Sequence, residues 1–265
     1  MRAVRVLLPA LILLVTTLGA TAPASAAAIG KYVALGDSYA VGVGTRTYDD
    51  ANDACRRGPL AFSRLWATAH PATQFVEASC SGAKVADVQN QIASITPDTN
   101  LVTVQVGGND AGFVDVLVNC ILTISDQDCV NRVAQAKATV TSTLPAALNA
   151  LYAHIRQAAP NAQVVVVGYP RLYKIGGTCG IFGLSDTERT ALNSASDTMA
   201  QVISAQASAA GFSYLDTRNT FAGHEICSSG AAWMTSLEWD KLNESYHPNT
   251  QGHAAVKAAL TSITD

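Results

Sequence analysis

The sequence predicts one α/β domain built on a parallel β-sheet with helices on both faces. Short apolar runs that suit strands alternate along the chain with longer segments of helical character, and such alternation favours this layered architecture. The clearest run is VVVV at 164–167, because four β-branched residues in a row are typical of a strand buried on both faces. We find neither an internal repeat nor a linker that would mark a second domain.

The first half of the chain contains three expected strands and two expected helices. The apolar run at 31–35 ends in glycine, as suits a buried strand that enters a loop, and 75–76 lies in a second short strand. The third strand is LVTVQV at 101–106, which again ends in glycine. A helix is expected at 59–69, where a proline takes the first helical position and apolar residues recur at helical spacing. Another is expected at 85–95, stopped near the proline at 97.

The second half continues the alternation. A long helical tract runs from about 130 to 158, and Pro145 marks a kink or a break in it. The helix expected at 185–210 begins with SDTE, a capping box in which Glu follows Ser by three positions. A last short strand at 213–215 precedes a terminal helix that runs to about 263 and is capped by Asn249 or Thr250.

The first residues have the order of a secretory signal peptide. Arg2 and Arg5 precede an apolar stretch at 6–20, and small residues then lead to Ala-Ser-Ala at 24–26. The stretch is interrupted by polar residues and is shorter than the roughly 18 apolar residues of a membrane span. We therefore expect cleavage after Ala26, with Ala28 as the next choice, a single domain at 27–265, a secreted product and no stable membrane anchor.

Six cysteines in an exported protein indicate disulfides, although six cysteines permit 15 pairings. We expect each to pair with its neighbour in the sequence. The chain holds no C-x-x-C pair, so we expect no zinc or other metal site. The expected pairs are Cys55–Cys80, Cys120–Cys129 and Cys179–Cys227.

The charge content is low and not basic. The formal net charge is −3, which argues against a nucleic-acid partner, since such proteins carry clustered basic surface. Charged residues make up 14 % of the chain, compared with about 25 % in typical soluble proteins. No phosphate-binding loop and no cofactor fingerprint is present. We expect a monomer without a cofactor.

Polar sequences follow three of the expected strands, and a fourth precedes the last helix. In parallel sheets, ligands bind outside the carboxyl ends of the strands. Each sequence alone is an ordinary turn, but the combination in this order is rare by chance. The four are GDSY at 36–39, CSGA at 80–83, GGND at 107–110 and SYHPN at 245–249.

The residue types in these loops suit ester hydrolysis. The Ser38 hydroxyl is a weak nucleophile until a base such as His247 removes its proton. Attack on an ester carbonyl creates an oxyanion that needs fixed donors. Gly82 can bring its backbone N–H close because it has no side chain, Asn109 can add a side-chain amide, and Ser38 can add its own N–H.

These same residues carry a resemblance to the SGNH hydrolases, also called GDSL lipases and esterases, and especially to their secreted actinobacterial branch. The resemblance spans residues 32 to about 260. It implies a flavodoxin-like three-layer α/β/α fold with five parallel strands, Ser38 as nucleophile, His247 as base, and Gly82 and Asn109 as oxyanion donors. Secreted members similar to this chain often carry three sequential disulfides.

Two positions depart from the family pattern. Tyr39 follows the serine where many members have Leu. Glu244 stands three residues before His247, where the family commonly has Asp. Either the Glu244 carboxylate orients His247, or a backbone carbonyl near Ser245 does so and the pair is a Ser–His dyad. The sequence leaves both open.

The remaining candidates are weaker. We expect His154 and His253 to be ordinary surface or partly buried residues, and we expect neither His70 nor His224 to be catalytic. Asp37 and Asp110 should fix their loops by hydrogen bonds. Further side chains could line a binding surface, although core packing explains the tryptophans equally well: Arg46, Trp233, Met234 and Trp239.

The substrate class is only partly determined by these residues. A small-molecule or lipid ester, cleaved by a lipase, esterase or phospholipase A, is the first expectation. A carbohydrate acetylesterase using the same site is the second. A secreted binding protein that has lost activity would lack the nucleophile or the base, and this chain has both.

Overall fold

The computed structural model describes residues 29–177 and 183–265. Its five strands form one parallel sheet in the order β2-β1-β3-β4-β5. The predicted α/β/α fold with five parallel strands is therefore confirmed. The strands are β1 (Lys31–Gly36), β2 (Gln74–Glu77), β3 (Leu101–Gln105), β4 (Gln163–Val167) and β5 (Ser213–Leu215).

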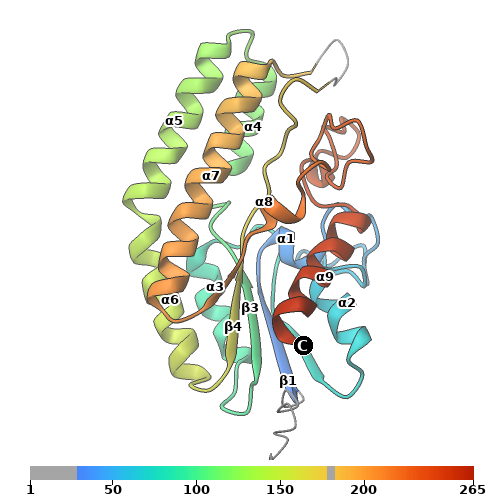
Figure 1. Ribbon diagram of the computed structural model, residues 1–265, viewed down its shortest axis with the longest axis vertical. Helices are drawn as coiled ribbons and strands as arrows, with labels where there is room; N and C mark the ends of the chain where they lie inside the picture. Colours follow the sequence, from blue (N-terminus) through green and yellow to red (C-terminus); the bar gives the residue numbers. More distant parts are fainter. Residues whose placement is uncertain (1–28, 178–182) are drawn as a thin grey trace, which may run out of the picture.

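Helices cover both faces of the sheet. Figure 1 shows α2 and α9 on one side and α3, α6 and α7 on the other, and α2 packs directly against α9. The helices are α1 (Ser38–Val41), α2 (Phe62–Ala69), α3 (Val85–Gln91), α4 (Phe113–Leu122), α5 (Asp126–Ser142), α6 (Leu144–Ala158), α7 (Asp186–Ala209), α8 (Thr217–Thr220) and α9 (Thr250–Thr264). Two 3₁₀ turns lie at Ile92–Ser94 and Leu242–Glu244.

The core lies between the sheet and these helices. The central strands β1 and β3 are buried along nearly their whole length, as expected for strands with helices on both faces. The helices α4, α5 and α7 extend beyond the carboxyl ends of the strands, toward the upper end of the molecule in Figure 1. They surround the space above the sheet in which a ligand would bind.

Some element boundaries differ from those predicted. The helix expected at 59–69 begins only at Phe62, because Gly58 to Ala61 form a hydrogen-bonded turn. The tract expected from 130 to 158 is two helices that meet at Thr143, and Pro145 lies in the first turn of α6, where its missing N–H costs nothing. Helix α5 starts at 126 because the Ser125 side chain caps it.

Three of the described helices were not predicted: α1, α4 and the single turn α8. Helix α1 is a single turn directly after β1, too short for a periodic pattern. Helix α4 follows Gly112, whose φ of 72° breaks the chain direction after the GGND loop. Its sequence, FVDVLVNCIL, is apolar on most sides, so it lacks the clear amphipathic spacing that marks a surface helix.

Two of the three expected disulfides are confirmed, Cys55–Cys80 and Cys120–Cys129. The third expected pair includes Cys179, which lies outside the described residues, as does the expected signal peptide and its cleavage site. Among residues 29–177 and 183–265, no helix is both long and apolar enough to cross a membrane.

Candidate active site

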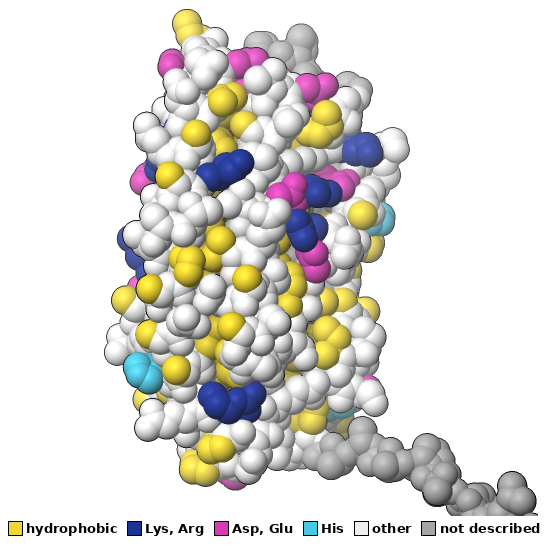
Figure 2. All heavy atoms as spheres, turned by 60° about the vertical axis from the view of Figure 1, so that its left-hand side comes forward, with side chains coloured by type: hydrophobic (Ala, Val, Ile, Leu, Met, Phe, Trp, Pro, Cys, Tyr) yellow, Lys and Arg dark blue, Asp and Glu magenta, His cyan; other side chains and the backbone are white. Residues whose placement is uncertain are grey.

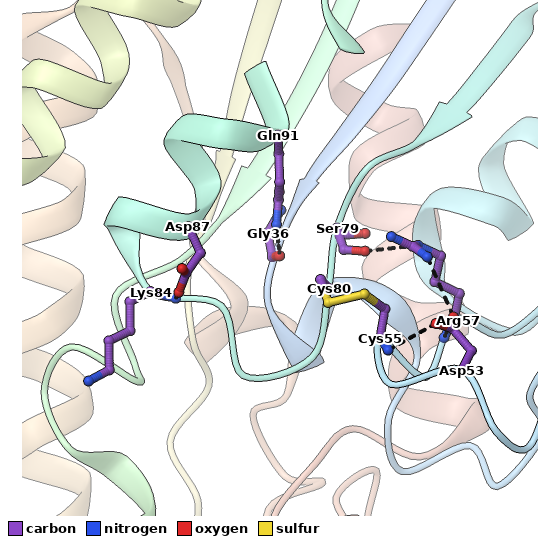
Figure 3. The surroundings of a disulfide bond; sticks show 9 residues. All are labelled: Gly36, Asp53, Cys55, Arg57, Ser79, Cys80, Lys84, Asp87 and Gln91. Atoms are coloured by element: carbon purple, nitrogen blue, oxygen red, sulfur yellow. Dashed lines mark hydrogen bonds and ion pairs between the residues drawn. A yellow bond between two sulfur atoms is a disulfide. The ribbon is translucent and has the colours of Figure 1, made fainter. Parts of the chain in front are cut away.

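Ser38 is the first residue of α1, immediately after β1. The Asp37 side chain caps this short helix by accepting a hydrogen bond from the Tyr39 N–H, at 3.0 Å. The Gln91 amide holds the end of β1 from α3: its oxygen accepts from the Gly36 N–H at 2.8 Å and its nitrogen donates to the Gly36 oxygen at 3.0 Å (Figure 3). Ser38, the expected nucleophile, therefore sits on a turn that is held from two sides.

His247 reaches Ser38 from the loop that precedes α9. Its Nε2 lies 2.8 Å from Ser38 Oγ, and its Nδ1 lies 2.8 Å from the backbone oxygen of Ser245. A carbonyl oxygen can only accept a hydrogen bond, so Nδ1 carries the proton and donates a hydrogen bond to the Ser245 oxygen. In the neutral ring, Nε2 is then the acceptor for the Ser38 hydroxyl, as a general base requires.

The protonation state of the ring agrees with this role. Burial lowers the pKa of His247 to about 4, because a charged imidazolium loses its hydration there. The hydrogen bond to Ser245 acts in the opposite direction and is the smaller effect. The imidazole is therefore neutral, and able to accept a proton, at and well below neutral pH.

The structure decides between the two alternatives for the group that orients His247. The Ser245 carbonyl holds the imidazole, whereas the Glu244 carboxylate is occupied by other partners. It accepts hydrogen bonds from the Gly44 N–H at 2.8 Å and from the Tyr48 hydroxyl at 2.6–2.7 Å, and it forms an ion pair with Arg56. Of the two alternatives, these contacts support the Ser245 carbonyl, and Glu244, the other candidate for that role, makes its hydrogen bonds elsewhere.

The physical reason is that the 3₁₀ turn at Leu242–Glu244 points the Glu244 side chain toward the loop after α1. Gly44 makes this close approach possible: its φ is +95°, and a Cβ there would lie 2.5 Å from the Pro248 oxygen and 2.9 Å from His247 Cβ. Glu244 is buried, so its charge is balanced by Arg56. It ties the loop that carries His247 to the loop that follows Ser38.

Tyr39 and Tyr246 make a second link between the two loops, which no residue pattern predicts. The Tyr39 hydroxyl donates to the Tyr246 backbone oxygen, and the Tyr39 ring lies 5.0 Å from the His247 ring. Tyr246 has a φ of 62°, uncommon for a residue with a side chain. Its hydroxyl and that of Tyr173 are hydrogen-bonded at 3.0 Å. The departure from Leu at position 39 thus supports the loop between Ser245 and His247.

The expected oxyanion donors lie on the loops after β2 and β3. Gly82 has a φ of +80°, and a Cβ there would meet nothing within 4 Å. Its positive φ by itself favours glycine, whatever space surrounds it. Asn109 donates one amide hydrogen to the Ala83 oxygen at 3.0 Å, which joins the two loops. A planar amide has a second hydrogen, which this bond does not use.

The disulfide Cys55–Cys80 fastens the chain two residues before Gly82. In Figure 3, Arg57 and Asp53 lie beside it. The Arg57 Nε donates to the Ser79 oxygen at 3.0 Å, and Asp53 accepts from the Cys55 N–H at 3.0 Å. The expected oxyanion loop is thus held on one side by a covalent bond and on the other by Asn109.

Asp37 and Asp110 fix loops, as expected. Asp37 is buried and accepts hydrogen bonds from the Tyr169 hydroxyl and the Tyr39 N–H. Burial raises its pKa to about 7, more than these hydrogen bonds lower it. Asp110 accepts from the Val85 N–H at 3.1 Å, and burial raises its pKa as well.

The other histidines do not contact Ser38. His253 is fully buried, which corrects the expectation of a surface or partly buried residue, and its Nδ1 accepts from the Phe62 N–H at 3.2 Å. His154 is exposed on α6 and bonds to Gln89. His70 and His224 stack on Trp66 and Trp233 respectively. Within the described part of the chain, no group of three or more His, Cys, Asp or Glu could hold a metal ion.

A largely apolar pocket opens beside Ser38 and extends between α4, α5 and α7. Ser38 and Asn109 are among the polar residues that line it, with Asp37, Lys137 and Ser196. The sequence did not predict this pocket, because its walls come from helices that the chain brings together only in the fold. Phe113, Val116, Val140, Leu172, Leu192 and Met199 are among the residues that line it.

A serine and a neutral imidazole in hydrogen-bond contact, at the carboxyl edge of a parallel sheet and beside an apolar pocket, define a serine-type hydrolase site. The chain belongs to the GDSL-like lipase/acylhydrolase family, which matches residues 34–255. It is a carboxylic ester hydrolase.

Similar proteins come from Streptomyces. The chain is 47 % identical over 232 residues to lipase 1 of Streptomyces coelicolor, covering 87 % of this chain and 85 % of the relative. It is 44 % identical over 239 residues to a lipase of Streptomyces rimosus, covering 89 % and 88 %.

Two solved structures of Streptomyces enzymes have the same fold as this chain. A phospholipase A1 from Streptomyces albidoflavus matches with a TM-score of 0.85 at 47 % identity, covering 89 % of this chain and 99 % of the other. An extracellular lipase from Streptomyces rimosus matches with a TM-score of 0.84 at 43 % identity, covering 89 % and 100 %.

Proposed function

We propose that the enzyme cleaves acyl esters of lipids through a covalent intermediate on Ser38, with His247 as its base. The observation that carries this proposal is the chain of two hydrogen bonds of 2.8 Å from Ser38 through His247 to the Ser245 carbonyl. The catalytic pair is a dyad, in which a backbone carbonyl takes the place of a triad carboxylate.

Each step follows from these contacts. His247 Nε2 accepts the proton of Ser38 Oγ as the oxygen attacks the ester carbonyl. The oxyanion that forms takes hydrogen bonds from the N–H groups of Ser38 and Gly82 and from the Asn109 amide. The imidazolium then gives its proton to the leaving alcohol, and the acyl group remains on Ser38. Water, deprotonated by the same imidazole, releases the acid and restores the serine.

The imidazolium in this cycle is stabilised first by its hydrogen bond to the Ser245 oxygen, a neutral dipole, while the nearby Glu244 charge favours it less and Arg56 opposes it. The low pKa of His247 in the resting enzyme is consistent with that arrangement. The cost of forming the imidazolium is offset in the transition state by the developing oxyanion beside it.

The apolar pocket favours acyl chains over acetyl groups. Its walls are formed by aliphatic and aromatic side chains from α4, α5 and α7, and such a surface gains free energy with each methylene that it takes from water, at about 0.8 kcal/mol. A carbohydrate acetylesterase needs no such space and would need polar groups for the sugar. The names of the relatives, lipases and a phospholipase A1, support the same substrate class.

An organophosphonate probe tests the nucleophile. The intact protein is expected to be labelled at one residue, and Ser38→Ala is expected to lose the label together with hydrolysis of aryl esters. Ser81→Ala is the matched control, because this serine lies one residue before the expected oxyanion glycine and should keep its labelling. Equal labelling of the intact protein and of Ser38→Ala would overturn the proposal.

The acyl pocket is tested by filling it. Ala195→Phe places a ring in the pocket from α7. We expect kcat/KM on an aryl palmitate to fall at least tenfold more than on an aryl acetate. Ala209→Phe, at the exposed end of the same helix, is the control and should change neither rate. An equal loss on both esters, or a sharp preference of the parent for acetate, would contradict the lipase assignment.

Several further properties belong to this proposal. The enzyme is secreted after removal of residues 1–26, works as a monomer with a single domain at 27–265, and has Cys179–Cys227 as a third disulfide. The even number of cysteines and the extracellular lipase among the relatives support these points. Mass spectrometry of the secreted protein, with and without reduction, measures the mature N-terminus and the number of disulfides together.

A further inference from the structure

The exposed large apolar side chains are concentrated at one end of the molecule. Among the described residues there are seven, and all lie on segments that follow the carboxyl ends of β3, β4 and β5, the edge of the sheet that carries Ser38. Scattered exposed apolar residues are normal, so their distribution is the informative feature. They are Val114, Val118, Leu122, Ile124, Ile175, Trp239 and Leu242.

Four of the seven belong to α4 or follow it directly. Val114, Val118 and Leu122 are spaced by four residues and therefore form one stripe along the helix. Ile124 is fully exposed beyond its end, in the turn to α5, which the disulfide Cys120–Cys129 holds. The stripe is thus presented on a braced helix hairpin.

The opposite side of α4 forms part of the substrate pocket. Phe113 and Val116 line the pocket, while Val118 and Leu122 on the same helix are 47 % and 67 % exposed. The exposed stripe therefore belongs to the same helix as the wall along which an acyl chain would lie, on the side that faces away from the pocket. A lipid aggregate bound by this stripe would lie next to the helix that forms the acyl-binding wall.

The second group lies on the loop that leads to His247. Trp239 is 68 % exposed and Leu242 is 59 % exposed, a few residues before the base. Figure 1 shows that this loop and the α4–α5 hairpin both project beyond the carboxyl ends of the strands, at the upper end of the molecule. Tryptophan is the residue type that most favours the boundary between water and lipid, because its ring is amphipathic.

The charges near these side chains do not favour a charged partner. Asp115 and Arg132, of opposite sign, lie beside Val118 and Leu122, and Asp126 and Asp128 follow Ile124. Trp239 lies between Glu238, which pairs with Arg46, and the neighbours Asp240 and Lys241, so both signs occur around these side chains. Figure 2 shows the flank over the long helices, where one cluster mixes positive and negative side chains and the other charged side chains are scattered among uncharged and hydrophobic ones. Binding through this end would depend on apolar burial and only weakly on salt.

We propose that this end of the molecule, defined by the α4 stripe with Ile124 and by Trp239 with Leu242, docks on the surface of an uncharged or zwitterionic lipid aggregate and places Ser38 above it. The proposal rests on the proposed lipid substrate. It adds the surface that brings the enzyme to aggregated lipid and the orientation in which it binds.

The test measures binding apart from catalysis. All proteins carry Ser38→Ala, so that vesicles of phosphatidylcholine are not hydrolysed, and binding is measured by flotation. Leu122→Ser, Ile124→Ser and Trp239→Ser are combined. We expect the partition coefficient to fall about tenfold or more, since each side chain buries apolar area on binding. The matched control replaces three exposed alanines elsewhere with serine: Ala138, Ala150 and Ala209.

Two further measurements fix the interpretation. With Ser38 restored, the triple variant should hydrolyse a soluble short-chain ester at the parent rate, which also shows that it is folded. Intrinsic fluorescence of the Ser38→Ala protein should shift to the blue on adding vesicles, and Trp239→Phe should remove that shift. Raising NaCl from 50 to 500 mM should change binding less than twofold.

Binding by the triple variant equal to that of the alanine control would overturn the docking face. The same residues could instead join two copies of the chain. In that case sedimentation would show the parent as a dimer and the triple variant as a monomer, while vesicle binding would be the same for both. This result too would overturn the proposal. Failure of the proposed function is recognised separately, as full hydrolysis of soluble ester by Ser38→Ala.

Discussion

Replacing Glu244 with Gln tests whether Glu244 supports the loop that carries His247 or acts directly on the His247 imidazole. The substitution keeps the shape of the side chain and removes its charge. The amide can still accept from Gly44 or Tyr48, but Arg56 loses its counter-charge. Nothing in the contact between His247 and the Ser245 carbonyl is changed directly.

The expected loss of stability follows from burial. The Glu244 side chain is 6 % exposed and that of Arg56 is 21 % exposed. Breaking a buried ion pair by removing one partner costs about 3–5 kcal/mol. Solvent screening of Arg56 and the amide that remains reduce this to about 2 kcal/mol. For a domain of this size that is a fall in Tm of about 4–8 °C.

The expected effect on turnover is small. If a carboxylate oriented the imidazole directly, its conversion to an amide would lower kcat by about 10⁴-fold. Since Glu244 acts through the loop, we expect kcat of the folded variant to fall less than tenfold. Calorimetry and initial rates on a soluble aryl ester, at a temperature well below the lower Tm, measure both.

Glu238→Gln is the matched control. Glu238 pairs with Arg46 nearer the surface, where the Arg46 side chain is 51 % exposed, so its loss should change Tm and rate very little. A 10⁴-fold loss of kcat in Glu244→Gln with an unchanged Tm would refute the assignment of the dyad. It would restore Glu244 as a direct partner of His247.

Three further predictions follow from the same contacts. Because burial lowers the pKa of His247 to about 4, the base is neutral above that pH, so kcat/KM should rise with a midpoint near pH 4 and stay level to neutral pH; a midpoint near 6.5 would contradict the burial of the ring. Tyr39→Phe leaves the Tyr246 backbone oxygen without its hydroxyl donor, which should lower the free energy of unfolding by about 1–2 kcal/mol and kcat about tenfold. An unchanged kcat and Tm would contradict a role of Tyr39 in holding the His247 loop. Replacing both cysteines of Cys55–Cys80 with serine should cost more stability than the same change at Cys120–Cys129, because the closed loops span 25 and 9 residues. The losses are at most about 3.5 and about 2.6 kcal/mol respectively. Equal shifts in Tm would contradict that order.

The parallel sheet was predictable because its strands are short buried runs followed by glycine or polar turns. The four valines at 164–167 fall within β4, and the run at 101–106 contains β3. Helix boundaries were less predictable, because they depend on partners far along the chain. The start of α2 at Phe62, whose N–H donates to His253, is such a case.

The sequence by itself predicted which loops carry the site, and in the structure two of its residues, Ser38 and His247, are in hydrogen-bond contact. Ser38, Gly82, Asn109 and His247 each follow a strand or precede a helix in loops that a parallel sheet must bring to one edge. This inference needs only the alternation of elements. It does not need the contacts of any side chain, which is why it could be made from residue patterns.

Only the tertiary structure decided what holds His247 and where an acyl chain can lie. Position 244 offers a carboxylate three residues before the histidine, yet the turn at Leu242–Glu244 directs it to Gly44 and Arg56, and the Ser245 carbonyl takes its place. The pocket between α4, α5 and α7 likewise exists only once these helices pack together. Both depend on the direction of side chains between segments distant in the chain, which local sequence patterns do not encode.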